Sequence, residues 1–116
     1  MLDGLRFLIV EDEPIIAFNL EDLLLSLGCQ RVLVAMHMEE AFQLIADSDI
    51  DAAVLDVNIH GERSYPLAEE LQRRSVKFVF ATGYGDAEHP AAFTAVPTLT
   101  KPYSSDSLVE ALRLAE

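Results

Sequence analysis

Short apolar runs in this sequence end in side chains that can do chemistry. The run at 52–55 ends in an acid, and other runs end in acids, a hydroxyl or an amine. If the runs are parallel strands, their carboxyl ends meet at one edge of the sheet, where ligands bind. The groups predicted to gather there are the carboxylates of Glu11, Asp12 and Asp56, the hydroxyl of Thr82 and the ammonium of Lys101.

Three carboxylates at one place repel each other unless a cation joins them. At 4 Å, two such charges cost each other roughly 4 kcal/mol at an effective dielectric near 20. A hard divalent ion such as Mg²⁺ relieves that repulsion and takes oxygen ligands from carboxylates, carbonyls and water. We therefore expect Mg²⁺ at this edge.

The elements that must position these groups alternate along the chain. Apolar runs predict five strands, and helical spacing of apolar residues follows each run, so we expect a doubly wound α/β fold. Its five parallel strands take the order 2-1-3-4-5, with helices on both faces. The weakest expected helix is Tyr84 to Phe93, because Gly85 and Pro90 flank or interrupt it. The expected strands are residues 6–10, 31–35, 52–55, 77–81 and 96–99.

Length and charge limit the classes to which the protein can belong. The 116 residues predict a single domain over 1–116. The formal net charge of −12 argues against binding of nucleic acid or an anionic membrane. No signal peptide or membrane span is expected, and the lone Cys29 excludes an internal disulfide. These features predict a cytoplasmic protein.

Four short pieces of the chain follow one another in order, each at a predicted strand end: Val10 to Pro14, Leu55 to Asn58, Ala81 to Gly83 and Thr100 to Pro102. Together these pieces resemble the receiver domain of bacterial two-component response regulators. The resemblance covers nearly the whole chain, which implies a receiver without an output domain. The string Phe80 to Tyr84 also resembles the stand-alone receiver subgroup nicknamed FAT GUY.

The resemblance implies roles for the acids. Asp56 is expected to be the nucleophile that accepts a phosphoryl group as an aspartyl phosphate. Asp12 and Asp56 are expected to bind Mg²⁺ directly, together with the backbone carbonyl of Asn58. Glu11 is expected to act on the ion through a bound water.

Roles for the hydroxyl and the amine come from the same resemblance. Thr82 is expected to donate its hydroxyl to a phosphoryl oxygen. Lys101 is expected to pair first with Asp56 and then with the phosphoryl group. The bond between Lys101 and Pro102 is expected to be cis. The protein is expected to turn over no metabolite, with chemistry limited to accepting and losing its own phosphoryl group.

One position departs from the receiver pattern. Receivers commonly carry an aromatic residue three positions before the lysine, and here that position is Thr98. In receivers, this ring moves inward when the active-site threonine moves. If the same coupling operates here, another residue must supply the ring. Tyr84 is the first substitute, with Tyr103 beside Pro102 as the second. Tyr84 and Asn58 are also expected to tune the lifetime of the phosphoryl group.

The implied donor is a phosphohistidine on a sensor histidine kinase, of the HWE type if the subgroup resemblance holds, or on a phosphotransfer protein. Output is expected through contacts with another protein. The alternative is a receiver-like binding module that works without phosphorylation, which Thr98 keeps open. A flavodoxin-like electron carrier is disfavoured because Glu11, Asp12 and Glu13 would repel a flavin phosphate. An aspartate-based phosphatase is disfavoured because Asn58 stands where a second acid is needed.

Overall fold

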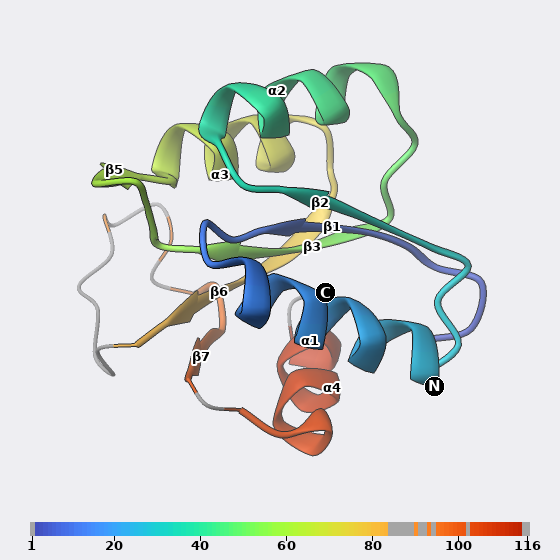
Figure 1. Cartoon of the computed structure of the whole chain (residues 1–116). Helices are drawn as coiled ribbons and strands as arrows, with labels where there is room; N and C mark the ends of the chain where they lie inside the picture. The colour runs from blue at the N-terminus through green and yellow to red at the C-terminus, as the bar shows by residue number, and fades with distance from the viewer. Residues whose placement is uncertain (1, 84–89, 91–92, 94, 102, 115–116) are drawn as a thin grey trace.

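A computed structural model describes residues 2–83, 90, 93, 95–101 and 103–114 of the chain. Five strands form one sheet in the order β2-β1-β3-β6-β7, and all neighbouring strands are parallel (Figure 1). In chain order these strands take the sheet order 2-1-3-4-5, so the predicted topology is confirmed. Their bounds are β1 Arg6–Val10, β2 Arg31–Ala35, β3 Ala52–Asp56, β6 Lys77–Thr82 and β7 Thr98–Thr100.

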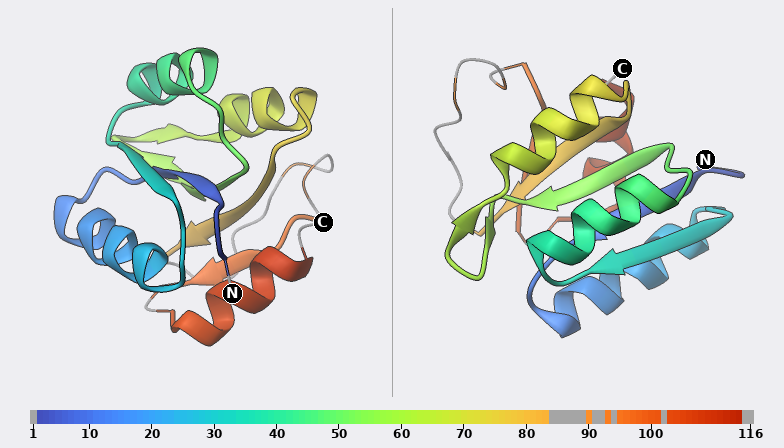
Figure 2. Two further views of the ribbon diagram at one scale, coloured as in Figure 1. Left: turned by 90° about the vertical axis from the view of Figure 1, so that its right-hand side faces the viewer. Right: turned by 90° about the horizontal axis from the view of Figure 1, so that it is seen from above.

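The described helices cover both faces of this sheet. One face packs against α1 and α4, and the other packs against α2 and α3 (Figures 1 and 2). Each face has its own apolar cluster because successive strand residues point to opposite sides. In β1, for example, Leu8 belongs to the α2–α3 cluster and Ile9 to the α1–α4 cluster. The bounds are α1 Pro14–Ser26, α2 Met38–Asp47, α3 Tyr65–Arg73 and α4 Ser105–Leu114.

The central strand β3 is apolar without a break because it is buried on both faces. Its first four residues, 52–55, are each at most 2% exposed. An uninterrupted apolar run is typical of a strand inside a parallel sheet. The strand therefore runs through the middle of the protein and ends at Asp56.

The sequence predicts a loop from Val57 to Arg63, but this segment after β3 is more ordered in the structure. It forms a small antiparallel hairpin, β4 Asn58–Ile59 and β5 Glu62–Arg63. Its two central residues, His60 and Gly61, have φ values of 50° and 84°. Two positive φ values in a row are the geometry of a tight hairpin turn, and glycine adopts the second without strain. This hairpin lies beside the end of β3 that carries Asp56.

The last strand starts later than the sequence predicted. We expected residues 96–99, but β7 spans Thr98–Thr100. The Val96 N–H is used in a turn, where it donates to the carbonyl of Phe93, and Pro97 has no N–H to give to the sheet. The expected weak helix, Tyr84 to Phe93, lies outside the described residues except for Pro90 and Phe93.

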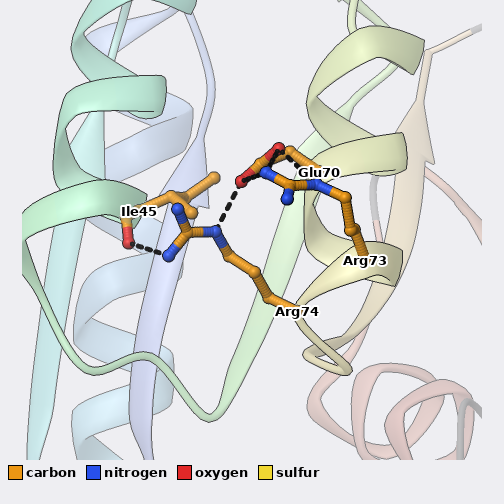
Figure 3. A network of polar contacts seen from close by, with 4 residues as sticks. All are labelled: Ile45, Glu70, Arg73 and Arg74. Carbon is orange, nitrogen blue, oxygen red and sulfur yellow. Dashed lines mark hydrogen bonds and ion pairs between the residues drawn. The ribbon is translucent and has the colours of Figure 1, made fainter.

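A polar network joins the ends of α2 and α3 (Figure 3). Arg74 donates one hydrogen bond to Glu70 at 2.5 Å and another to the carbonyl of Ile45 at 3.3 Å. Arg73 also pairs with Glu70, at 2.6 Å. The network is far from the carboxyl edge of the sheet and contributes to the scaffold rather than to the site.

Candidate functional site

The register of the sheet brings the predicted groups to one edge. Val10 pairs with Leu55, so Glu11 and Asp12 follow β1 beside Asp56 at the end of β3. Asp56 pairs with Ala81, which places Thr82 one residue further on the next strand. Thr82 pairs with Thr100, the residue before Lys101.

The three carboxylates form a compact cluster. Glu11, Asp12 and Asp56 each place one oxygen within 4.8 Å of the others. Among the described residues this is the one group of three or more acids, histidines or cysteines with that spacing. Such a cluster offers only hard oxygen atoms, which suits a cation such as Mg²⁺.

Lys101 bridges two of the three acids. Its Nζ lies 2.5 Å from Glu11 Oε1 and 3.0 Å from Asp56 Oδ2. The side chain of Glu11 is 4% exposed, that of Asp56 13% and that of Lys101 16%. The ammonium is thus held inside the cluster by two charged partners.

Backbone N–H groups orient each carboxylate. Asn58 donates to Asp56 Oδ1 at 3.2 Å, and His60 donates to Asp12 Oδ2 at 2.9 Å. Glu13 donates to Glu11 Oε2 at 3.2 Å. Two of these three donors belong to the β4–β5 hairpin or its turn, so the hairpin is part of the site.

The pKa values of the cluster follow from this geometry. Burial raises the pKa of Glu11 to about 7, and a hydrogen bond with Asp56 adds to the rise although Lys101 opposes it. Burial alone would lower the pKa of Lys101, but its bonds to Glu11 and Asp56 outweigh this and the pKa is raised. Burial likewise acts to raise the pKa of Asp12, but hydrogen bonds from His60 and Glu11 outweigh it, so the pKa is lowered. One ammonium cannot balance three carboxylates. Glu11, the most buried of the three, is the one that most readily keeps a proton.

A cavity of about 770 Å³ opens above these residues. Asp12, Asp56, Thr82 and Lys101 line it, as the sequence predicted for one shared site. Thr82 is 4% exposed. Because Asp56 lines this cavity, its carboxylate has room in front of it for a ligand.

The sequence analysis missed two residues that also line this cavity, Arg63 and Tyr65. Arg63 is carried by the hairpin that was expected to be a loop. The ring of Tyr65 stacks on Phe93, with centroids 5.6 Å apart and an interplanar angle of 12°. The dipeptide His60-Gly61 was the available signal for Arg63. A two-residue turn at these positions predicts a hairpin, and the hairpin fixes which residues face each other.

The structure describes only one of the three residues that were expected to report phosphorylation. Tyr84 and Pro102 lie outside the described residues. Tyr103 is partly buried, and burial raises its pKa to about 12. It borders a second cavity of about 450 Å³ beside α1, which shares Lys101 as a wall with the first. His37 and His60 are exposed, and their rings stack with centroids 4.6 Å apart.

Residues 7–113 match the family model of the response regulator receiver domain. The chain belongs to this family. The receiver domain is similar to SdrG from Sphingomonas melonis Fr1, with 42% identity, a TM-score of 0.87 and coverage of 99% of this chain and 98% of SdrG. It is also similar to the BeF3-activated conformation of SdrG, with a TM-score of 0.81 over 98% of each chain.

Longer regulators match the receiver domain as well. The positive alginate biosynthesis regulatory protein of Pseudomonas aeruginosa is 34% identical over 96% of this chain and 47% of its own length. Sensory transduction protein LytT of Bacillus subtilis is 32% identical over 94% of this chain and 47% of its own length. The chain thus spans about half the length of these curated relatives.

Family membership fixes the general function. A receiver domain is a phosphorylatable signalling switch that works with a histidine kinase or a phosphotransfer partner. Receiver domains bind Mg²⁺ at an acidic pocket, and the cluster of Glu11, Asp12 and Asp56 has that character. None of the helices in the described part of the chain is both long and apolar enough to span a membrane.

Proposed function

We propose that Asp56 accepts a phosphoryl group from a phosphohistidine, in a Mg²⁺-dependent reaction, and that the modified domain signals through protein contacts. The observation that carries this proposal is the position of Lys101 between Glu11 and Asp56, at 2.5 and 3.0 Å. A fixed cation beside a carboxylate nucleophile stabilises charge on a transferring phosphoryl group. The partly buried carboxylate at the floor of the cavity has no comparable use in a simple binding module.

The donor set suits Mg²⁺. The side chain of Glu11 is 4% exposed and does not line the cavity, whereas Asp12, Asp56 and Asn58 do. This favours Asp12, Asp56 and the carbonyl of Asn58 as direct ligands, with Glu11 acting through a water. The ion, when bound, supplies positive charge to the phosphoryl oxygens.

The transfer itself uses an oxygen of Asp56. That oxygen forms a bond to phosphorus while the P–N bond of the donor histidine breaks. The electron pair of the broken bond stays on the ring nitrogen, and with the other nitrogen protonated the histidine leaves as neutral imidazole. Lys101 then pairs with the phosphoryl oxygens, and Thr82 donates its hydroxyl to one of them.

The proposed reaction is a single self-modification followed by loss of the phosphoryl group, without turnover of a metabolite. The alternative, a module that binds without phosphorylation, rests on Thr98 in place of the usual aromatic residue. Tyr65 lines the cavity and stacks on Phe93, so it supplies an aromatic ring between the site and the segment after β6. This contact supports the switch over the alternative.

We further propose that the chain belongs to the FAT GUY subgroup, on the string Phe80 to Tyr84, and that an HWE-type kinase is its donor. The same proposal places the protein in the cytoplasm. Tyr84, Tyr103 and Pro102 remain the residues predicted to report phosphorylation to the partner.

Mass spectrometry after incubation with acetyl phosphate and Mg²⁺ tests the proposal. The wild type gains the mass of one phosphoryl group, and Asp56→Ala does not. A parallel titration with beryllofluoride and Mg²⁺, followed by amide spectra, separates the switch from the binding module. A wild type that gains no mass and shows no spectral change would falsify the phosphorylation proposal.

A further inference from the structure

Charge balance in the main cavity points to a residue outside the predicted set. An incoming phosphoryl donor is an anion, and it meets Asp12, Glu13 and Asp56 on the walls of the cavity. Of the residues that line it, all in the described part of the chain, only Lys101 and Arg63 carry positive charge. The net charge of the whole chain, −12, opposes the donor further.

The two cations are in different situations. Lys101 is already bonded to two carboxylates and is only 16% exposed. Arg63 is exposed, and its side chain has no hydrogen bond or ion pair with the rest of the described chain. Among the lining residues that the structure describes, Arg63 therefore carries the one guanidinium available to a new anionic partner.

The hairpin holds Arg63 at a fixed place relative to Asp56. Arg63 pairs with Asn58 across the hairpin, and the N–H of Asn58 donates to the Asp56 carboxylate. Ile59 is fully buried in the core, and the N–H of Ser64 donates to the carbonyl of Val57 at 2.9 Å. The backbone that carries Arg63 is thus anchored on both sides.

We propose that Arg63 is a phosphoryl-binding residue that captures the incoming donor at the rim of the cavity. Its planar guanidinium can donate two parallel hydrogen bonds to phosphoryl oxygens, which a lysine ammonium cannot do. It forms no covalent bond and transfers no proton. It acts by holding the nonreacting oxygens while Asp56 attacks phosphorus.

This inference rests on the proposed phosphorylation of Asp56, so the experiment separates the two. Phosphorylation by acetyl phosphate is followed by mass spectrometry over a range of donor concentrations at fixed Mg²⁺. Arg63→Ala raises the KM for acetyl phosphate about tenfold and leaves the maximal rate unchanged, as expected for the loss of an exposed charge-assisted contact. Arg63→Lys gives an intermediate KM because it keeps the positive charge but loses the planar group that donates two parallel hydrogen bonds.

Arg31→Ala is the matched control. Arg31 is also exposed and starts β2, at the opposite edge of the sheet, so its loss changes the net charge equally without touching the cavity. Its KM should equal that of the wild type. A second readout is the concentration of beryllofluoride that gives half of the thermal stabilisation at fixed Mg²⁺, which rises about tenfold in Arg63→Ala only.

The outcomes are distinct. If Arg63→Ala and Arg31→Ala have the same KM and the same beryllofluoride response, the role of Arg63 is overturned while the phosphorylation of Asp56 stands. A wild type that responds to neither reagent overturns the proposed function and this inference together.

Discussion

The N–H of His60 donates a 2.9 Å hydrogen bond to the carboxylate of Asp12, although the two residues are 48 positions apart. This bond joins the hairpin after β3 to the acid after β1. It fixes the direction of a carboxylate that faces the cavity, and it makes the hairpin a support for the predicted metal site.

Asp12→Asn should weaken Mg²⁺ binding by at least about tenfold, because a neutral amide replaces a charged oxygen ligand in the cluster. The measurement is the rise in melting temperature as Mg²⁺ is added. Asp22→Asn on the exposed side of α1 makes the same change of charge and should keep the wild-type response. Equal responses of the two variants would count against Asp12 as a ligand.

Lys101→Met should slow phosphorylation by acetyl phosphate about 100-fold, because it removes the cation that faces the transferring group. The measurement is a time course of the phosphorylated mass. Lys77→Met serves as the control, since Lys77 starts β6 at the other edge of the sheet. If both variants react at the wild-type rate, Lys101 has no part in the transfer.

The metal-free protein should lose stability as pH rises from about 4.5 to about 7. The folded pKa of Glu11 is raised from 4.5 to about 7, so in this window the folded state binds more protons than the unfolded state. The charged groups that face Glu11 are Asp56, Asp12 and Lys101. As pH rises, Glu11 loses its proton and becomes a second negative charge beside Asp56.

The measurement is the urea midpoint in EDTA at several pH values. The fall in the urea midpoint with rising pH should be strongest in the wild type. It should be much smaller in Glu11→Gln, whose side chain at position 11 cannot ionise. A wild type whose stability instead climbs through this window would show that Glu11 is charged throughout.

Phe80→Ala should lower the free energy of unfolding by about 3–5 kcal/mol, because it empties a fully buried aromatic site. Phe80 is 0% exposed and makes edge contacts with Tyr65, Phe78 and Phe93. Phe18 on α1 is 52% exposed, so Phe18→Ala should cost less than about 1 kcal/mol. Urea denaturation of both variants measures the difference, and equal losses would contradict the assigned packing.

The sequence alone was sufficient for the order of strands and for the main groups of the site. Continuous apolar runs marked the buried strands, and the residue after each run had to fall at the carboxyl edge because the strands are parallel. That is why Glu11, Asp12, Asp56, Thr82 and Lys101 could be placed together. The local break at Pro97 shifted the start of β7, but it did not move Lys101 from the edge.

Only the tertiary structure decided how charge is distributed in that site. Three features depend on distances between segments far apart in the chain: the bridge from Lys101 to two acids, the burial of Glu11, and which cation of the cavity has no partner among the described residues. The hairpin that carries Arg63 is likewise stabilised by contacts with Asp12 and with the core, which no local pattern of four residues encodes. Periodicity specifies which face a residue occupies, whereas its partners and its pKa are set by the packing of the whole chain.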